Sequence, residues 1–171
     1  MYKIKLEQIS QWGVSTVKES FNRLPKTDHR DGQYRLRRYS RVKLCDTDHF
    51  KYMKLESEPF NQSGRYNKFQ GGVDRKFEDI EDEVFESGGM LEICDTFSTS
   101  NGLSDDHEIE IHQMRIITRD ELTPVSPEGV HQDGYRFIAM VGINRYNITG
   151  GNLLVYKTYE GKPIVDFLLE S

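Results

Sequence analysis

The chain has 171 residues, which is enough for one domain with a sizeable core. Its formal net charge of −5 and scattered acidic residues give no reason to expect a nucleic-acid or polyanion partner. Two cysteines, Cys45 and Cys94, are too few for a disulfide framework, and no apolar run is long enough to span a membrane. We therefore expect a single domain over residues 1–171, located in the cytoplasm.

The N-terminal part of the chain is predicted to be helical. Apolar residues recur at roughly helical intervals between residues 6 and 24, and Pro25 closes the pattern because proline cannot continue a helix. Such a helix would pack its apolar stripe on the rest of the fold. We assign residues 1–30 to an N-terminal helical part and expect the strands within residues 31–171.

Strand patterns begin at about residue 33. The segment QYRLRRYSRVKL, residues 33–44, alternates aromatic or apolar residues with basic ones, which is typical of a strand. A polar, turn-rich stretch follows. A short helix is predicted within residues 78–92, ending at the pair Gly88–Gly89.

The last third of the chain is predicted to be mostly strand. The segment DHEIEIHQMRIITR, residues 106–119, is long and alternating. Further strands are expected in GVHQDGYRFIAMVGINRY (129–146) and NLLVYKTYEG (152–161), separated by a turn at 147–151. A helix followed by many strands indicates a β-sandwich or barrel with helices packed outside.

The sharpest chemical signal is the tripeptide His131-Gln132-Asp133. Residues two apart on a strand point to the same face, so the imidazole and the carboxylate would converge on one point. A 2-His-1-carboxylate iron centre needs this pair and one distant histidine, and it leaves coordination positions open for other ligands. The alternative is a histidine hydrogen-bonded to a neighbouring loop, with Asp133–Gly134 forming a turn.

Strand parity sorts the side chains of the preceding strand. The face that carries Ile109 and Ile111 also carries Gln113 and Arg115, and the isoleucines favour that face as the interior. A buried Arg115 guanidinium would need a carboxylate partner, either from a substrate or cosubstrate or from a structural Asp or Glu. The same parity turns His112 outward, which makes it a poor candidate for a third metal ligand.

The segment VHQDGYRFIAMVGINRYNITGGNLLVY resembles the core of the bacterial 2-oxoglutarate and iron(II) dioxygenases that hydroxylate free L-amino acids, such as the L-isoleucine dioxygenases. The resemblance extends upstream over several further motifs. They are RYSR at 38–41, YN followed by GG, Arg75 and Phe77 within residues 66–77, and HQMR at 112–115.

This resemblance implies a double-stranded β-helix (jelly-roll, cupin-like) fold with flanking helices. It implies iron(II) as the metal, with His131 and Asp133 as two of its ligands, and 2-oxoglutarate as the cosubstrate. The substrate would be a free L-amino acid, with an aliphatic side chain favoured. Gln113 and Arg115 match the HQxR strand of the family, and we expect them to bind the substrate.

The chain departs from the family pattern in one respect, because no histidine follows His131. Family members continue past the position of Ser171, and that stretch holds the second iron histidine and a basic residue for the distal carboxylate of 2-oxoglutarate. Three explanations remain open: a fragment of a longer enzyme, an inactive truncation, or a complementing chain, which includes a homo-oligomer. We expect a fragment, with no nucleic-acid or membrane partner.

Two other functions compete with the dioxygenase. The first is a non-catalytic jelly-roll module that binds a partner and has lost the iron. The second is a cupin-type isomerase or sugar-modifying enzyme on a similar barrel. Metal uptake that depends on Asp133 distinguishes the dioxygenase from the first, and oxygen-dependent release of succinate distinguishes it from the second.

Overall fold

The computed structural model describes residues 3–45, 52–119 and 121–169. The chain begins with helix α1 (Gln11–Lys18), which runs into the 3₁₀ helix η1 (Glu19–Arg23). The predicted helix over 6–24 is therefore confirmed but starts later, because Ser10 caps α1 by accepting a hydrogen bond from the Gly13 amide at 2.9 Å. No helix in these ranges is long and apolar enough to cross a membrane.

The central element is an antiparallel sheet with the strand order β2-β1-β3. Its strands are β1 (Arg35–Leu44), β2 (Tyr52–Lys54) and β3 (Glu108–Ile116). The two long strands fall where the alternating patterns predicted them. Their register places Tyr39 opposite His112, which fixes the face on which every other side chain of the pair lies.

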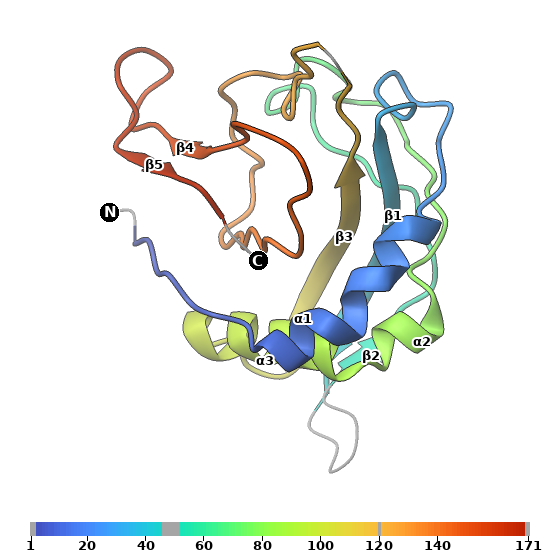
Figure 1. Ribbon diagram of the computed structural model, residues 1–171. Helices are drawn as coiled ribbons and strands as arrows, with labels where there is room; N and C mark the ends of the chain where they lie inside the picture. Colours follow the sequence, from blue (N-terminus) through green and yellow to red (C-terminus); the bar gives the residue numbers. More distant parts are fainter. Residues whose placement is uncertain (1–2, 46–51, 120, 170–171) are drawn as a thin grey trace.

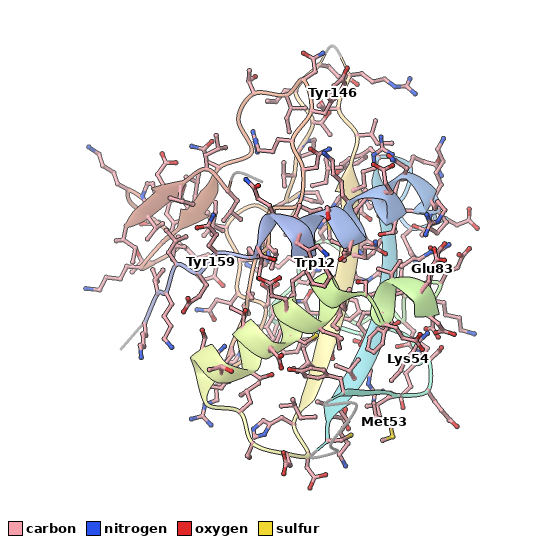
Figure 2. All side chains as sticks on the ribbon, turned by 60° about the horizontal axis from the view of Figure 1, so that its bottom comes forward. Trp12, Met53, Lys54, Glu83, Tyr146 and Tyr159 are labelled. Carbon is pink, nitrogen blue, oxygen red and sulfur yellow. The ribbon has the colours of Figure 1, made fainter. Side chains whose placement is uncertain are left out.

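Helices α1, α2 (Asp82–Phe85) and α3 (Gly88–Asn101) pack against one face of this sheet (Figure 1). The burial of apolar side chains between the helices and the sheet is the main stabilising contribution to this layer. Lys54, labelled in Figure 2, connects β2 to α2, since its Nζ donates to the Ile80 carbonyl at 3.1 Å and to Asp82 Oδ1 at 2.7 Å. The core is formed by Val17, Val42, Leu44, Tyr52, Ile80, Val84, Phe85, Met90, Cys94 and Ile143.

The short helix predicted within residues 78–92 is found as α2, but it ends at Phe85. The pair Gly88–Gly89 begins helix α3, so the prediction that this pair ends a helix is wrong. A Cβ on Gly88 would lie 1.9 Å from the ring of Trp12, and a Cβ on Gly89 would lie 2.0 Å from the carbonyl oxygen of Gly13. Figure 2 shows Trp12 between α1 and α3. The two glycines therefore serve the close crossing of two helices, and Ser87 caps the second of them.

The other sheet face is covered as well, which corrects the expectation that His112 points outward. The His112 ring lies 4.8 Å from the Tyr39 ring and 4.6 Å from the Phe60 ring, measured between centroids. Phe60 comes from a segment without long strands that pairs only through an isolated bridge to Arg75. Strand alternation in β3 gives no sign of this second layer, because the layer comes from a distant part of the chain.

The C-terminal part lies beside β3, to the left in Figure 1, and contains the two-stranded antiparallel sheet β4 (Leu153–Val155) and β5 (Val165–Phe167). The predicted turn at 147–151 is confirmed, with positive φ angles at Asn147, Gly150 and Gly151. The predicted strand over 129–146 is not found, since no residue of that described range is in a strand. An extended segment becomes a strand only when a neighbouring strand takes up its hydrogen bonds.

Candidate functional site

His131 and Asp133 lie together in the structure, with 3.2 Å between Nε2 of the imidazole and Oδ1 of the carboxylate. Both side chains are half-buried. On its other side, the imidazole has Nδ1 2.7 Å from the carbonyl oxygen of Gly129. A carbonyl can only accept, so Nδ1 carries a hydrogen, and Nε2 is the ring nitrogen that faces Asp133.

The two side chains converge in a loop and not on the predicted strand. Gly129 and Gly134 bracket the pair, and both have positive φ angles, of 70° and 82°. A Cβ on Gly134 would also lie 2.8 Å from the ring of Tyr66. Glycine at these positions lets the backbone turn before and after the pair, which brings the imidazole and carboxylate to one side.

A buried amide positions Asp133. Gln62 donates from Nε2 to Asp133 Oδ1 at 3.1 Å, and its Oε1 accepts a hydrogen bond from Asn67 Nδ2 at 2.9 Å. The Asn67 amide also lies 3.4 Å from Glu128 Oε1. Gln62 and Asn67 are both buried, so this chain of hydrogen bonds ties the loop of the candidate site to a segment about 70 positions earlier.

These residues fit two of the three protein ligands of a 2-His-1-carboxylate iron(II) centre. An imidazole nitrogen with a free lone pair and a carboxylate oxygen are the donors of a facial triad. Their separation of 3.2 Å is close to the ~3 Å expected for adjacent ligands of one metal ion. Within the described residues, no group of three or more His, Cys, Asp or Glu side chains is arranged to hold a metal, so His131 and Asp133 stand there without a third side chain of this kind.

Gln113 and Arg115 lie on the helix-covered side of the sheet. Gln113 is buried and donates from Nε2 to Ser20 Oγ at 2.5 Å, while Arg115 donates from Nη1 to Asn22 Oδ1 at 3.0 Å. The expectation that Arg115 is buried is wrong, because the side chain is exposed where β3 passes the end of η1. The structure therefore does not bring these two residues to His131 and Asp133, and their role in substrate binding stays a prediction.

The face that carries His112 is the one that approaches the candidate site. Tyr135, two residues after Asp133, donates from its hydroxyl to Glu110 Oε2 at 2.5 Å, and Glu110 shares a face of β3 with His112. Burial and the positive charges of Arg37, Arg75 and Arg35 lower the pKa of His112 to about 3, so the ring is neutral. Sequence reasoning missed Gln62 and this face, although RYSR, Asn67, Arg75 and HQMR all belong to the motifs that carry the family resemblance.

Comparison with known proteins agrees with this chemistry. A family model described as 2OG-Fe dioxygenase matches residues 18–171. The crystal structure of a bsmA homolog from Methylobium petroleophilum PM1 is similar, with a TM-score of 0.73 and 25% sequence identity. That similarity covers 93% of this chain but 65% of the other, so the chain spans less than two thirds of that protein's length. Comparison with curated proteins gives no match.

Iron(II) and 2-oxoglutarate are the metal and the cosubstrate that this family match implies. The pair of His131 and Asp133 lies inside the matched region, and its donor atoms suit that metal. The chain belongs to the 2OG-Fe dioxygenase family.

Proposed function

We propose that the chain carries the iron-binding part of an Fe(II)- and 2-oxoglutarate-dependent hydroxylase built on a jelly-roll scaffold. Its substrate would be a free L-amino acid, with an aliphatic side chain favoured. The observation that carries the proposal is the approach of His131 Nε2 to Asp133 Oδ1 at 3.2 Å, while Nδ1 of the same ring lies 2.7 Å from the Gly129 carbonyl oxygen. The third protein ligand would come from further residues of the polypeptide or from a complementing chain.

Iron(II), with 2-oxoglutarate and dioxygen, supplies the oxidation of an unactivated C–H bond when bound. The residues of this chain hold and orient the metal. The Gly129 carbonyl keeps the proton of His131 on Nδ1, and the Gln62 amide fixes the rotation of the Asp133 carboxylate. Such outer contacts set the ligand geometry before the metal binds, which raises affinity.

An anaerobic iron(II) titration of the 171-residue chain in the presence of 2-oxoglutarate tests the proposal. We expect His131→Ala and Asp133→Asn each to weaken iron uptake by more than the roughly 10–100-fold that loss of an outer-shell partner costs, because each removes a direct ligand. His107→Ala and Asp105→Asn are matched controls, because both residues are exposed and lie outside the site. Uptake that is the same in Asp133→Asn as in the parent chain would contradict the proposal.

Iron uptake and succinate release separate the competing functions. A non-catalytic binding module would take up no iron that depends on Asp133. A cupin-type isomerase would bind a metal but would not release succinate from 2-oxoglutarate in the presence of oxygen. Succinate release is measured on the protein that includes the third ligand.

A further inference from the structure

The His112 face of the sheet holds two buried guanidinium groups without a carboxylate partner. Arg37 and Arg75 are 6% and 2% exposed, and neither forms an ion pair within the described residues. The Nε and Nη2 atoms of Arg75 are buried without a hydrogen-bond partner in that part of the chain. Burying a charge without a counter-charge is costly, so these arginines require an explanation.

Each of the two guanidiniums is packed against a phenylalanine ring, Arg37 against Phe77 at 5.2 Å and Arg75 against Phe60. The Arg75 guanidinium carbon lies 4.7 Å from the centroid of the Phe60 ring, which is also in contact with the His112 ring. Arg37 is opposite Met114 in the register, on the same face as His112, and its Nη2 is 3.9 Å from Met114 Sδ. Nδ1 of His112 is likewise buried with no partner among the described residues.

The nearby carboxylates are already in use. Asp31 is 2.5 Å from Arg35 Nη1 and accepts a hydrogen bond from Gln70 Nε2 at 3.0 Å. Glu128 is 3.8 Å from the same Arg35 nitrogen. Asp31 and Glu128 both contact Arg35, and Glu110, on the His112 face, accepts a hydrogen bond from Tyr135, so none of the three forms an ion pair with Arg37 or Arg75.

We propose that Arg37, Arg75 and His112 form a carboxylate-binding site beside the metal ligands. Two arginines can each present parallel N–H donors to a carboxylate, and the neutral His112 ring can add one more donor from Nδ1. Water can satisfy the hydrogen bonds of these groups, but only an anion neutralises the charge. Burial, with the charges of Arg35 and Arg75, lowers the pKa of Arg37 to about 10, so the group remains a cation at neutral pH.

One segment of the chain connects this site to the proposed metal pair. Phe60 and Gln62 are neighbours on one segment, so the segment that holds Arg75 through the bridge at Phe60 also holds Asp133. This inference rests on the proposed function for its source of carboxylate: the amino-acid substrate or 2-oxoglutarate. Both present the same chemistry to the arginines.

Calorimetric titration of the metal-free chain with L-isoleucine, L-isoleucinamide and succinate tests the site. Binding of L-isoleucine but not of its amide assigns the site to the substrate carboxylate, whereas binding of succinate assigns it to the cosubstrate. Arg75→Met and Arg37→Met should each weaken the bound probe by roughly 10–100-fold. Arg30→Met is the matched control, because Arg30 also stacks on a phenylalanine, Phe69, but is exposed.

Thermal unfolding without any probe gives a second readout. Removing an unpaired buried charge should leave the Tm of Arg75→Met unchanged or higher, while a structural arginine would lower it. Arg75→Lys keeps the positive charge but loses the paired N–H donors of the guanidinium. This variant should bind the carboxylate probe weakly while staying folded. No binding of any probe by the parent chain, or a failure of both Arg75 variants to fold, would overturn the inference.

The experiments distinguish failure of the proposed iron site from failure of the proposed carboxylate site. Iron uptake that depends on Asp133, without binding of any carboxylate probe, would retain the metal site and remove the carboxylate site. Carboxylate binding that depends on Arg75, without iron uptake, would do the reverse.

Discussion

Gln62 illustrates what single side chains contribute to the metal site. The closeness of His131 and Asp133 was predicted from strand spacing, but the structure brings them together in a loop that turns at Gly129 and Gly134. Gln62 was not predicted, since its contact with Asp133 joins residues 71 positions apart. No pattern of alternation or spacing encodes which amide will lie beside a given carboxylate.

Replacing Gln62 with leucine should lower iron(II) affinity without touching a ligand. The variant removes the 3.1 Å hydrogen bond to Asp133 Oδ1 and leaves the Asn67 amide with one acceptor fewer. Loss of an outer-shell partner costs about 10–100-fold in metal affinity, and we expect the lower end of that range here. Anaerobic titration measures it. Gln33→Leu serves as the control, since the Gln33 side chain donates to the Thr27 carbonyl, away from Asp133. Equal iron(II) affinities of the Gln62→Leu and Gln33→Leu variants would refute a positioning role for Gln62.

His112 should make the protein less stable in mild acid. The pKa of His112 in the folded state is about 3, below the ordinary value of 6.5. Between these two pH values, His112 is protonated in the unfolded chain but not in the folded chain. The stability is fully present above pH 6.5 and falls as the pH drops from there toward 3, by at most about 1.4 kcal/mol per pH unit. Urea unfolding of the parent and of His112→Phe at pH 7.5 and pH 5 measures this, and the variant should lose less. An equal loss of unfolding free energy in the parent and the variant would show that the pKa of His112 is not lowered in the folded state.

At the scale of secondary-structure elements, the sequence predicted the N-terminal helix and the two long strands. The alternation in residues 33–44 and 106–119 indicated β1 and β3, because it follows the period of two that is typical of strands. Helix α3 was missed because Gly88–Gly89 looked like a terminator. Glycine marks both a helix end and a close helix crossing, and only the tertiary contact with α1 distinguishes them.

Gly89→Ala should destabilise the contact between α1 and α3. The added methyl group would lie 2.0 Å from a backbone oxygen of Gly13, so the helices must move apart, at a cost of about 1–3 kcal/mol. The gain in helix propensity offsets less than about 1 kcal/mol. Urea unfolding followed by circular dichroism gives the value. Gly64→Ala is the control, since its Cβ would have ordinary contacts at 3.9 Å, and a stability equal to that of the control would exclude the close crossing.

For the molecule as a whole, the expectation of strands with flanking helices holds in coarse form, as two small antiparallel sheets with helices beside one of them. The segment 129–146 was predicted as a strand from its apolar alternation, but strand formation depends on a partner that alternation does not supply. Ile138 and Met140 of this segment are 53% and 60% exposed. Exposed apolar residues close together are typical of surfaces that contact another chain or segment.

This exposure predicts concentration-dependent self-association of the 171-residue chain. Ile138→Asn with Met140→Gln should reduce the associated fraction, because it removes apolar surface that association would bury. Sedimentation velocity over a range of concentrations measures the fraction. Leu122→Gln is the control, since Leu122 is 99% exposed and lies outside this segment. A parent chain that remains monomeric throughout would contradict the prediction.

The hydrogen-bonded chain from Asp133 through Gln62 to Asn67 and Glu128 closes a ring, because Glu128 and Asp133 belong to one loop. Binding of a metal at the proposed site and the ordering of that distant segment are therefore expected to be linked, and each would favour the other by the same free energy. Asn67 would thus influence the affinity of the proposed site for iron(II) without contacting the ion.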